Sequence, residues 1–308
     1  MLLLVLTALI WGVAFVFQST GGEAVGPFTF ICLRFLMGGT VLLPVIRLLD
    51  KMGLTEHRPQ TKQDRRALLL GGVCCGLCLT GVTVFQQLGL HLGTAPGKAG
   101  FLTACYIVLV PVLGLFLKRR CGLHVWIAVL ITLAGLYLLC MEGSLTLRLS
   151  DGLVLLCSLC NALHILTIDH FTRRLDAVRM SCIQFYTVGL IAAVPMVLTE
   201  MGTDAASVGR WAAAFSSPDA WIALLYAGIL SSGVAFTLQC VGQQDVEPTV
   251  ASLLMSLESV FSVLAGWLML GERMSLRALL GCGLIFCAVV LSQLPGGRKA
   301  DQDASEGV

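Results

Sequence analysis

The chain has 308 residues, of which 57% are hydrophobic and only 12% charged, and its formal net charge is +2. This composition excludes a soluble domain with an ordinary core, and so small a charge gives no reason to expect a nucleic-acid partner. We therefore expect a polytopic protein that is embedded in a lipid bilayer.

Apolar segments of about 20 residues, the length that crosses the hydrocarbon core, follow one another along the chain. We expect helices, because backbone hydrogen bonds in a bilayer must close within each segment. The predicted spans are 2–18, 27–49, 66–88, 97–117, 123–140, 151–170, 178–199, 219–239, 248–270 and 275–294. The predicted fold is an all-α membrane protein with ten transmembrane helices, followed by a disordered cytoplasmic tail at 295–308.

Lysine and arginine are unevenly divided between the two sides of the predicted membrane. If the N-terminus is cytoplasmic, only Lys98, Arg148, Arg210, Arg273 and Arg277 fall in outer loops, and most other basic residues fall in cytoplasmic ones. Cytoplasmic loops are normally the richer in Lys and Arg. Both termini are therefore expected in the cytoplasm, with the protein a multi-pass component of the cell membrane.

The two halves of the sequence resemble each other. Phe35 matches Phe185 at an offset of 150 residues, and Pro96 matches Pro248 at an offset of 152. Matching prolines indicate that the backbones of the two halves match as well, because each proline would begin a helix. Residues at such matching positions are called repeat mates below.

These matches predict two repeats, at 1–141 and 151–294. Each repeat contains five spans, which is an odd number, so the second copy must enter the membrane from the opposite side. The repeats are therefore expected to be inverted. Inverted repeats can exchange conformations, and this exchange provides a physical route to alternating access.

Short motifs are distributed over both halves of the chain: Leu9-Ile10-Trp11-Gly12, Gly26-Pro27-Phe28, Arg34-Phe35, Leu257-Glu258-Ser259-Val260-Phe261 and Leu270-Gly271-Glu272. In their order and spacing the chain resembles the drug/metabolite transporter superfamily, EamA type, over roughly residues 2–294. The resemblance implies ten helices in two inverted EamA-like repeats. It also implies a central cavity lined mainly by the first, third and fourth helices and their repeat mates, and transport of small metabolites, often amino acids outward.

A polar helix face occurs once in each half of the chain. In the first half it consists of Thr80, Thr83, Gln87 and His91, and the matching positions of the second half hold Ser232, Ala235, Gln239 and Gln243. Polar groups in hydrocarbon are costly unless they face a partner or a wet cavity. Gln87 and Gln239 are therefore candidate substrate-binding residues. The alternative is hydrogen bonding between helices that only holds the bundle together.

The first and sixth spans contain three further candidates. Trp11 lies too deep for an interfacial aromatic belt, so it either packs in the core or forms an aromatic wall of the cavity. Its repeat mate is Asn161, which shares a helix face with His164. His164 could bind substrate or carry a proton, or it could simply hydrogen-bond to a neighbouring helix.

Four more residues carry charge or polarity into the spans. Arg34 could attract a substrate carboxylate or extend to the interface as an anchor. Lys98, at the start of a helix, favours an anion, and Tyr106 lies two turns deeper, where it could line the same cavity. Glu258 is an acidic residue deep in a span, which suits a proton carrier; a structural hydrogen bond is the alternative.

Together these features predict a secondary transporter or facilitator of a small polar metabolite, an exporter of an amino acid or related compound. The alternatives are a membrane-embedded enzyme acting on a lipid-linked substrate and a nucleotide-sugar or organophosphate carrier of the same superfamily. No catalytic residue, cofactor or metal is expected, because ATPase and zinc motifs are absent from the sequence.

The expected partners are a small-molecule substrate, the bilayer and a coupling proton. Gly283 and Cys287 on the last span would also permit a homodimer.

Overall fold

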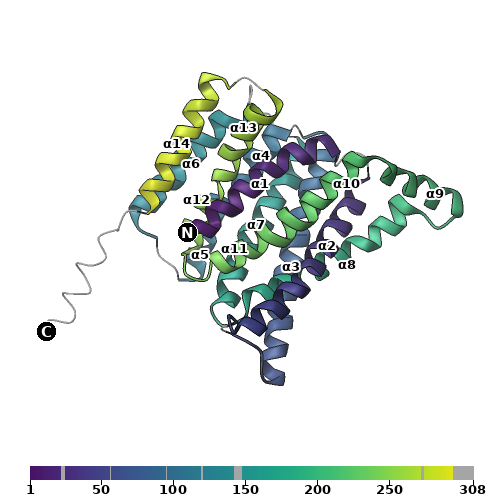
Figure 1. Cartoon of the computed structure of the whole chain (residues 1–308). Coiled ribbons are helices and arrows are strands. Elements are labelled where there is room, and N and C mark those ends of the chain that lie inside the picture. The colour runs from purple at the N-terminus through teal and green to yellow at the C-terminus, as the bar shows by residue number, and fades with distance from the viewer. Residues whose placement is uncertain are drawn as a thin grey trace.

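The computed structural model describes residues 1–21, 25–55, 57–94, 96–118, 121–141, 148–271 and 274–293. Every regular element in these ranges is helical, and the helices lie side by side in one bundle (Figure 1). The first half contains α1 (Leu2–Gly21), α2 (Pro27–Met52), α3 (Lys62–His91), α4 (Pro96–Ala104), α5 (Tyr106–Phe116) and α6 (Leu123–Cys140). The second half contains α7 (Leu149–Thr172), α8 (Ala177–Pro195), η1 (Met196–Met201), α9 (Ala205–Ala213), η2 (Ala214–Ser216), α10 (Pro218–Leu225), η3 (Tyr226–Ala235), α11 (Phe236–Gly242), α12 (Pro248–Met255), α13 (Leu257–Leu270) and α14 (Leu276–Ser292).

Eight helical segments within the described part of the chain are long and apolar enough to cross a membrane, and they match the second to ninth predicted spans. Two shorter apolar helices, Leu2–Ala14 and Leu276–Ser292, lie where the first and tenth spans were predicted. At a rise of 1.5 Å per residue, α14 is about 25 Å long, slightly less than the hydrocarbon core of about 30 Å. The all-helical membrane fold is confirmed, while the count of ten spans stays a prediction. The predicted tail at 295–308 lies outside the described residues.

Two predicted spans, 97–117 and 248–270, are each divided into two helices. The breaks fall at Cys105, between α4 and α5, and at Ser256, between α12 and α13. The Ser256 hydroxyl donates to the carbonyl of Leu253 at 2.6 Å, a local bond that competes with the regular helical pattern and bends helices. The breaks are 151 positions apart, so the two repeats are interrupted at matching places.

A further departure from α-helix occurs in the predicted span 219–239. Its central part, η3, is a π-helix of 10 residues between α10 and α11. The matching part of α3 in the first repeat is regular α-helix. Because π-helices are rare and are found frequently at functional sites, this difference between the repeats makes η3 a candidate functional element.

The first helix of each repeat packs into the other repeat. Helix α1 contacts α10, η3, α11, α12 and α13, all from the second half of the chain. Helix α7 packs mainly against α3, α4 and α5, all from the first half, and makes smaller contacts with α11 and α12 of its own half. In Figure 1, α1 accordingly lies beside α11 and α13 rather than among the helices that follow it in sequence.

The matching helices α2 and α8 pack against each other in opposite directions. At one end of the pair, the Glu200 carboxylate in η1 accepts hydrogen bonds from the backbone N–H groups of Phe28 and Thr29 at 2.8 and 2.6 Å. It also accepts one from the Thr29 hydroxyl at 2.6 Å. An anion is favoured here, because the first N–H groups of a helix have no partner within the helix.

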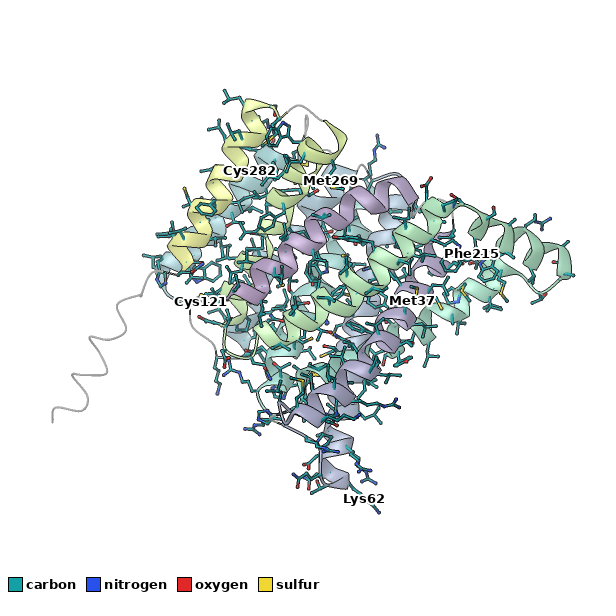
Figure 2. All side chains as sticks on the ribbon, in the orientation of Figure 1. Met37, Lys62, Cys121, Phe215, Met269 and Cys282 are labelled. Carbon is teal, nitrogen blue, oxygen red and sulfur yellow. The ribbon has the colours of Figure 1, made fainter. Side chains whose placement is uncertain are left out.

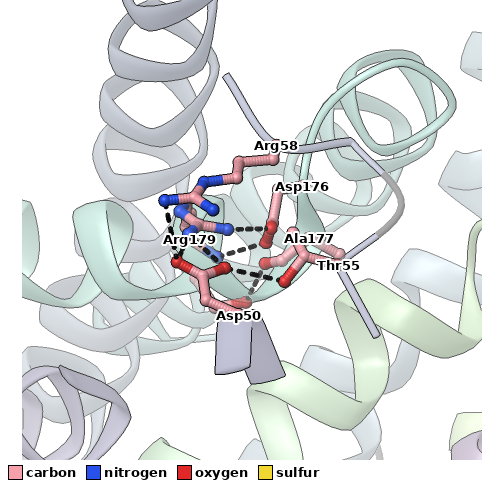
Figure 3. Close-up of polar contacts among 7 residues, drawn as sticks. Asp50, Thr55, Arg58, Asp176, Ala177 and Arg179 are labelled. Atoms are coloured by element: carbon pink, nitrogen blue, oxygen red, sulfur yellow. Dashed lines mark hydrogen bonds and ion pairs between the residues drawn. The ribbon is translucent and has the colours of Figure 1, made fainter. Parts of the chain in front are cut away.

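At the other end of the pair, Asp50 near the end of α2 binds Arg179 in the first turn of α8 (Figure 3). The two carboxylate oxygens of Asp50 lie 2.7 and 2.6 Å from one guanidinium nitrogen, and Arg179 also binds Asp176 at 2.5 Å. Asp50 and Glu200 are repeat mates at an offset of 150, as are Thr29 and Arg179. The α2–α8 pair is therefore joined at both ends by matching contacts.

The last helices of the repeats, α6 and α14, also pack together and cross closely at two glycines. A Cβ atom placed on Gly135 would lie 2.8 Å from the carbonyl oxygen of Gly281, and one placed on Gly281 would lie 2.7 Å from that of Gly135. Only glycine allows this approach, which is a common way for membrane helices to associate. Lys62 at the start of α3 lies at one extremity of the bundle (Figure 2).

The two ends of the α2–α8 pair can be tested separately. Glu200→Gln removes a charge that accepts three hydrogen bonds, so we expect the free energy of unfolding to fall by roughly 1.5–3 kcal/mol. Asp50→Asn should also lower thermal stability, measured as the melting temperature in detergent. Asp245→Asn is the matched control, because Asp245 is exposed and has no ion pair with any described residue. If Glu200→Gln and Asp50→Asn both melted at the same temperature as Asp245→Asn, the assigned contacts would be contradicted.

Candidate functional site

An aromatic cluster lies where five helices of the two repeats meet. Its centre is Phe236 of α11, whose ring centroid is 4.6 Å from Trp11, 5.9 Å from Phe35, 6.2 Å from Phe185 and 6.3 Å from His164. Phe35 and Phe185 are repeat mates and contact each other at 5.9 Å. The cluster thus joins α1, α2, α7 and α8 to α11 at the boundary between the repeats.

Helix α1 is attached to the π-helix η3 by hydrogen bonds beside this cluster. The Trp11 indole N–H donates to the carbonyl of Ser231 at 3.2 Å, and the Thr7 hydroxyl donates to that of Ala235 at 3.1 Å. In the opposite direction, the Tyr226 hydroxyl donates to a backbone carbonyl of α1 at 3.0 Å. Trp11 is half-buried and is held by both its ring and its N–H group.

Arg34 lies at the edge of the aromatic cluster. Its Nε donates to the hydroxyl of Ser232 at 3.1 Å, and its guanidinium carbon lies 4.9 Å from the ring centroid of Phe35 and 5.7 Å from that of Phe30. Such cation–π contacts are attractive and fix the plane of the group. A guanidinium has five N–H donors, and the other four make no hydrogen bond with a described residue.

His164 belongs to a buried chain of polar groups. Its Nε2 lies 3.0 Å from Oε1 of Gln184, and Nε2 of Gln184 donates to the sulfur of Cys240 at 3.5 Å. His164 is fully buried, and its Nδ1 has no hydrogen-bond partner among the described residues. If the amide oxygen accepts from Nε2, the neutral imidazole leaves Nδ1 as an unused acceptor.

Other polar groups on the predicted faces also lack partners in the described part of the chain. Gln239 is buried with its Oε1 unpaired, and Gln243 is buried with both amide atoms unpaired. Gln87 and Asn161, on the neighbouring helices α3 and α7, are half-buried and make no hydrogen bond with a described residue. A buried polar atom without a partner costs about 1–3 kcal/mol, so a native protein that retains one usually has a use for it.

Lys98 has a partner that was not foreseen. Its ammonium group pairs with Asp151 in the first turn of α7, a carboxylate that is almost completely buried. The same carboxylate accepts hydrogen bonds from the Thr94 hydroxyl at 3.0 Å and the backbone N–H of Arg148 at 2.6 Å. The predicted anion-binding lysine is therefore part of an ion pair that links α4 to α7.

Tyr106 and Glu258 follow the two helix breaks and are repeat mates at an offset of 152. Tyr106 is buried in the largest apolar cluster of the bundle. Glu258 is half-buried, and its carboxylate makes no hydrogen bond with a described residue. Its backbone oxygen would lie 2.8 Å from a Cβ atom on Gly12, so the absence of a side chain there lets α1 approach this turn of α13 closely.

The model of the EamA-like transporter family matches residues 1–141 and 148–294. The chain belongs to the EamA-like transporter family.

Two relatives of this EamA-like transporter support the assignment over nearly the whole chain. An uncharacterized transporter from Archaeoglobus fulgidus is 26% identical, covering 94% of this chain and 84% of the relative. The uncharacterized transporter YoaV from Bacillus subtilis is 22% identical, covering 97% of this chain and 98% of the relative. A solved crystal structure has the same fold, with a TM-score of 0.77 and 20% identity over 96% of this chain and 97% of that one.

The structure brings together only part of the predicted site of this EamA-like transporter. Trp11, Arg34 and His164 meet at the aromatic cluster, whereas Lys98 is engaged in its ion pair. Sequence reasoning missed Phe236, because nothing in a lone phenylalanine marks it as a centre of contacts. It also missed Gln184, for which a signal existed, since Gln184 is the repeat mate of Arg34.

The role of the Lys98–Asp151 pair can be measured with a double-mutant cycle. Lys98→Met leaves a buried carboxylate without its partner, so we expect a loss of roughly 3 kcal/mol in the free energy of unfolding. Asp151→Asn in the same chain should recover much of that loss, and thermal melting of the single and double variants measures the coupling. A Lys98→Met variant as stable as the wild type would exclude a structural role for the lysine.

Proposed function

We propose that this transporter moves a small polar metabolite by alternating access, and that it exports an amino acid or a related compound. The observation that carries the proposal is the set of polar groups with unused hydrogen-bonding capacity close to the aromatic cluster: Arg34, His164 and Gln239. They come from helices of both repeats. A substrate between the repeats could use them without first breaking bonds within the protein.

The chemistry of these groups suits a zwitterion. The free N–H groups of Arg34 can bind a carboxylate, a contact that guanidinium makes with two parallel hydrogen bonds. The unpaired oxygen of Gln239 and the unpaired Nδ1 of His164 are acceptors that suit an ammonium group. The rings of Trp11 and Phe236 would pack against an apolar side chain, and half-buried Gln87 and Asn161 would extend the polar surface.

The arrangement of helices supports inverted repeats, and the uneven distribution of Lys and Arg supports both termini in the cytoplasm. The matching helices α2 and α8 run antiparallel, as inversion requires. Because α1 packs among α10–α13 and α7 packs among α3–α5, we propose that the rocking bodies are not the two sequence repeats. Each body instead consists of one repeat's central helices and the other repeat's first helix.

The alternatives have less support. An organophosphate or nucleotide-sugar carrier would use Lys98 as its second cation beside Arg34, and Lys98 is instead paired with Asp151. A membrane-embedded enzyme would concentrate its acids, bases or metal ligands at one face. The two relatives are both named transporters rather than enzymes.

Transport can be tested in proteoliposomes with radiolabelled amino acids, sugars and phosphorylated metabolites. We expect flux of an amino acid and a reduction of roughly 10- to 100-fold in Arg34→Gln, the loss of 1.5–3 kcal/mol for a hydrogen bond to a charged group. Arg65→Gln is the control, because Arg65 is an exposed arginine at the start of α3. Flux confined to sugars or phosphorylated compounds would reject the amino-acid assignment, and no flux of any compound would reject transport of small polar metabolites.

We further propose that Glu258 carries the coupling proton. In Glu258→Gln the side chain keeps its size but cannot release a proton, so flux driven by a pH gradient should be abolished while exchange at equal pH persists. The measurement compares flux with and without the gradient at equal protein density. Asp245→Asn, on an exposed carboxylate, should behave as wild type. Unchanged gradient dependence in Glu258→Gln would remove Glu258 from the coupling mechanism.

A further inference from the structure

An apolar cavity of about 540 Å³ lies on the outer surface of the bundle between α5 and α7. Leu113, Phe116 and Leu117 line it on the α5 side, and Leu163 and Leu166 line it on the α7 side. The side chains of Phe116 and Leu163 are 81% and 42% exposed, so the cavity opens outward from the bundle. In a membrane this cavity faces lipid.

A second cavity of about 340 Å³ adjoins the first, and its lining includes two arginines. The two share His170 and Phe171 at the end of α7. The second is lined in addition by Arg173, Arg174 and, from α3, Ala67. The apolar hollow along α5 and α7 therefore continues into a hollow with basic side chains at the end of the helix.

The charge of this end is positive. Arg173 binds Asp169 at 2.9 Å, and this hydrogen bond raises the pKa of the Arg173 guanidinium. Arg174 is exposed and makes no ion pair with any described residue. The His170 ring is also exposed and lies 4.9 Å from that of Phe171. Asp169 balances the charge of Arg173, and the charge of Arg174 has no carboxylate partner among the described residues.

We propose that the two adjoining cavities form a binding site for one anionic phospholipid. An acyl chain would occupy the apolar cavity between Leu113 and Leu163, and the phosphate would lie at Arg174 and Arg173. A free phosphate ion would leave the apolar cavity between α5 and α7 empty, and a neutral lipid would leave the positive charge of the arginines unbalanced. Basic pockets beside membrane helices bind anionic headgroups in this way. The positive-inside rule would place this end in the cytoplasmic leaflet.

Native mass spectrometry of the full-length chain, purified in detergent, tests the proposal with phosphatidylglycerol and phosphatidylcholine as the probes. We expect the wild-type chain to retain one phosphatidylglycerol in preference to phosphatidylcholine. The double variant Arg173→Gln/Arg174→Gln should lose that preference, with retention of phosphatidylglycerol falling at least about 10-fold, the effect of 1.4 kcal/mol. Leu163→Trp, which fills the apolar cavity, should reduce retention of either lipid.

Two variants serve as matched controls. Arg65→Gln removes a basic residue of the same end that lines neither cavity, and Leu156→Trp adds the same bulk two turns earlier on the same face of α7, where Leu156 is 45% exposed. Both should retain phosphatidylglycerol as the wild type does. Equal retention of the two lipids by the wild-type chain, or an equal loss in Arg65→Gln and the double variant, would overturn the proposal. Arg174 is exposed and makes no ion pair with any described residue, whereas Arg173 pairs with buried Asp169. The single variant Arg174→Gln should therefore fold and also reduce retention of phosphatidylglycerol, which keeps the test valid even if the double variant or Leu163→Trp fails to fold.

Discussion

The exchange of first helices between the repeats is the packing constraint on which the rest of this molecule depends. In a bilayer the hydrophobic effect does not drive helices together, so close packing and hydrogen bonds must do so. Helix α1 meets this requirement through Thr7 and Trp11, which bind carbonyls of η3, and through Gly12, which admits α13. With α1 and α7 exchanged, the later helices of each half pack against the first helix of the other half.

The backbones of the two repeats match, but the side chains at matching positions often differ. The α2–α8 pair is joined at matching ends, but Asp50 binds an arginine side chain whereas Glu200 binds the start of a helix. The repeat mate of Trp11 is Asn161, and that of Arg34 is Gln184. The shared backbone supplies two equivalent conformations in principle. The two repeats therefore present different side chains at equivalent positions.

Three departures from regular α-helix lie where helices of the two repeats meet. The breaks at Cys105 and Ser256 precede Tyr106 and Glu258, and the π-helix η3 supplies the carbonyls that hold α1. Irregular backbone inside a membrane is tolerated only where neighbouring groups satisfy it or where it lines a cavity. These three places are therefore the natural points at which the bundle could bend during a transport cycle.

Much of the architecture was predictable, because hydropathy along the chain and the offset of about 150 residues are local or periodic signals. They identified the helices, the repeat and the acidic residue at 258. The partners of individual side chains were not predictable. Lys98 pairs with Asp151, 53 positions away, and Phe236 becomes the centre of the aromatic cluster only when four other helices surround it. The sequence alone determined which segments are helices and how they are duplicated. Only the tertiary structure decided which polar groups meet, since this depends on the rotation and depth of each helix against its neighbours, and no local pattern records either.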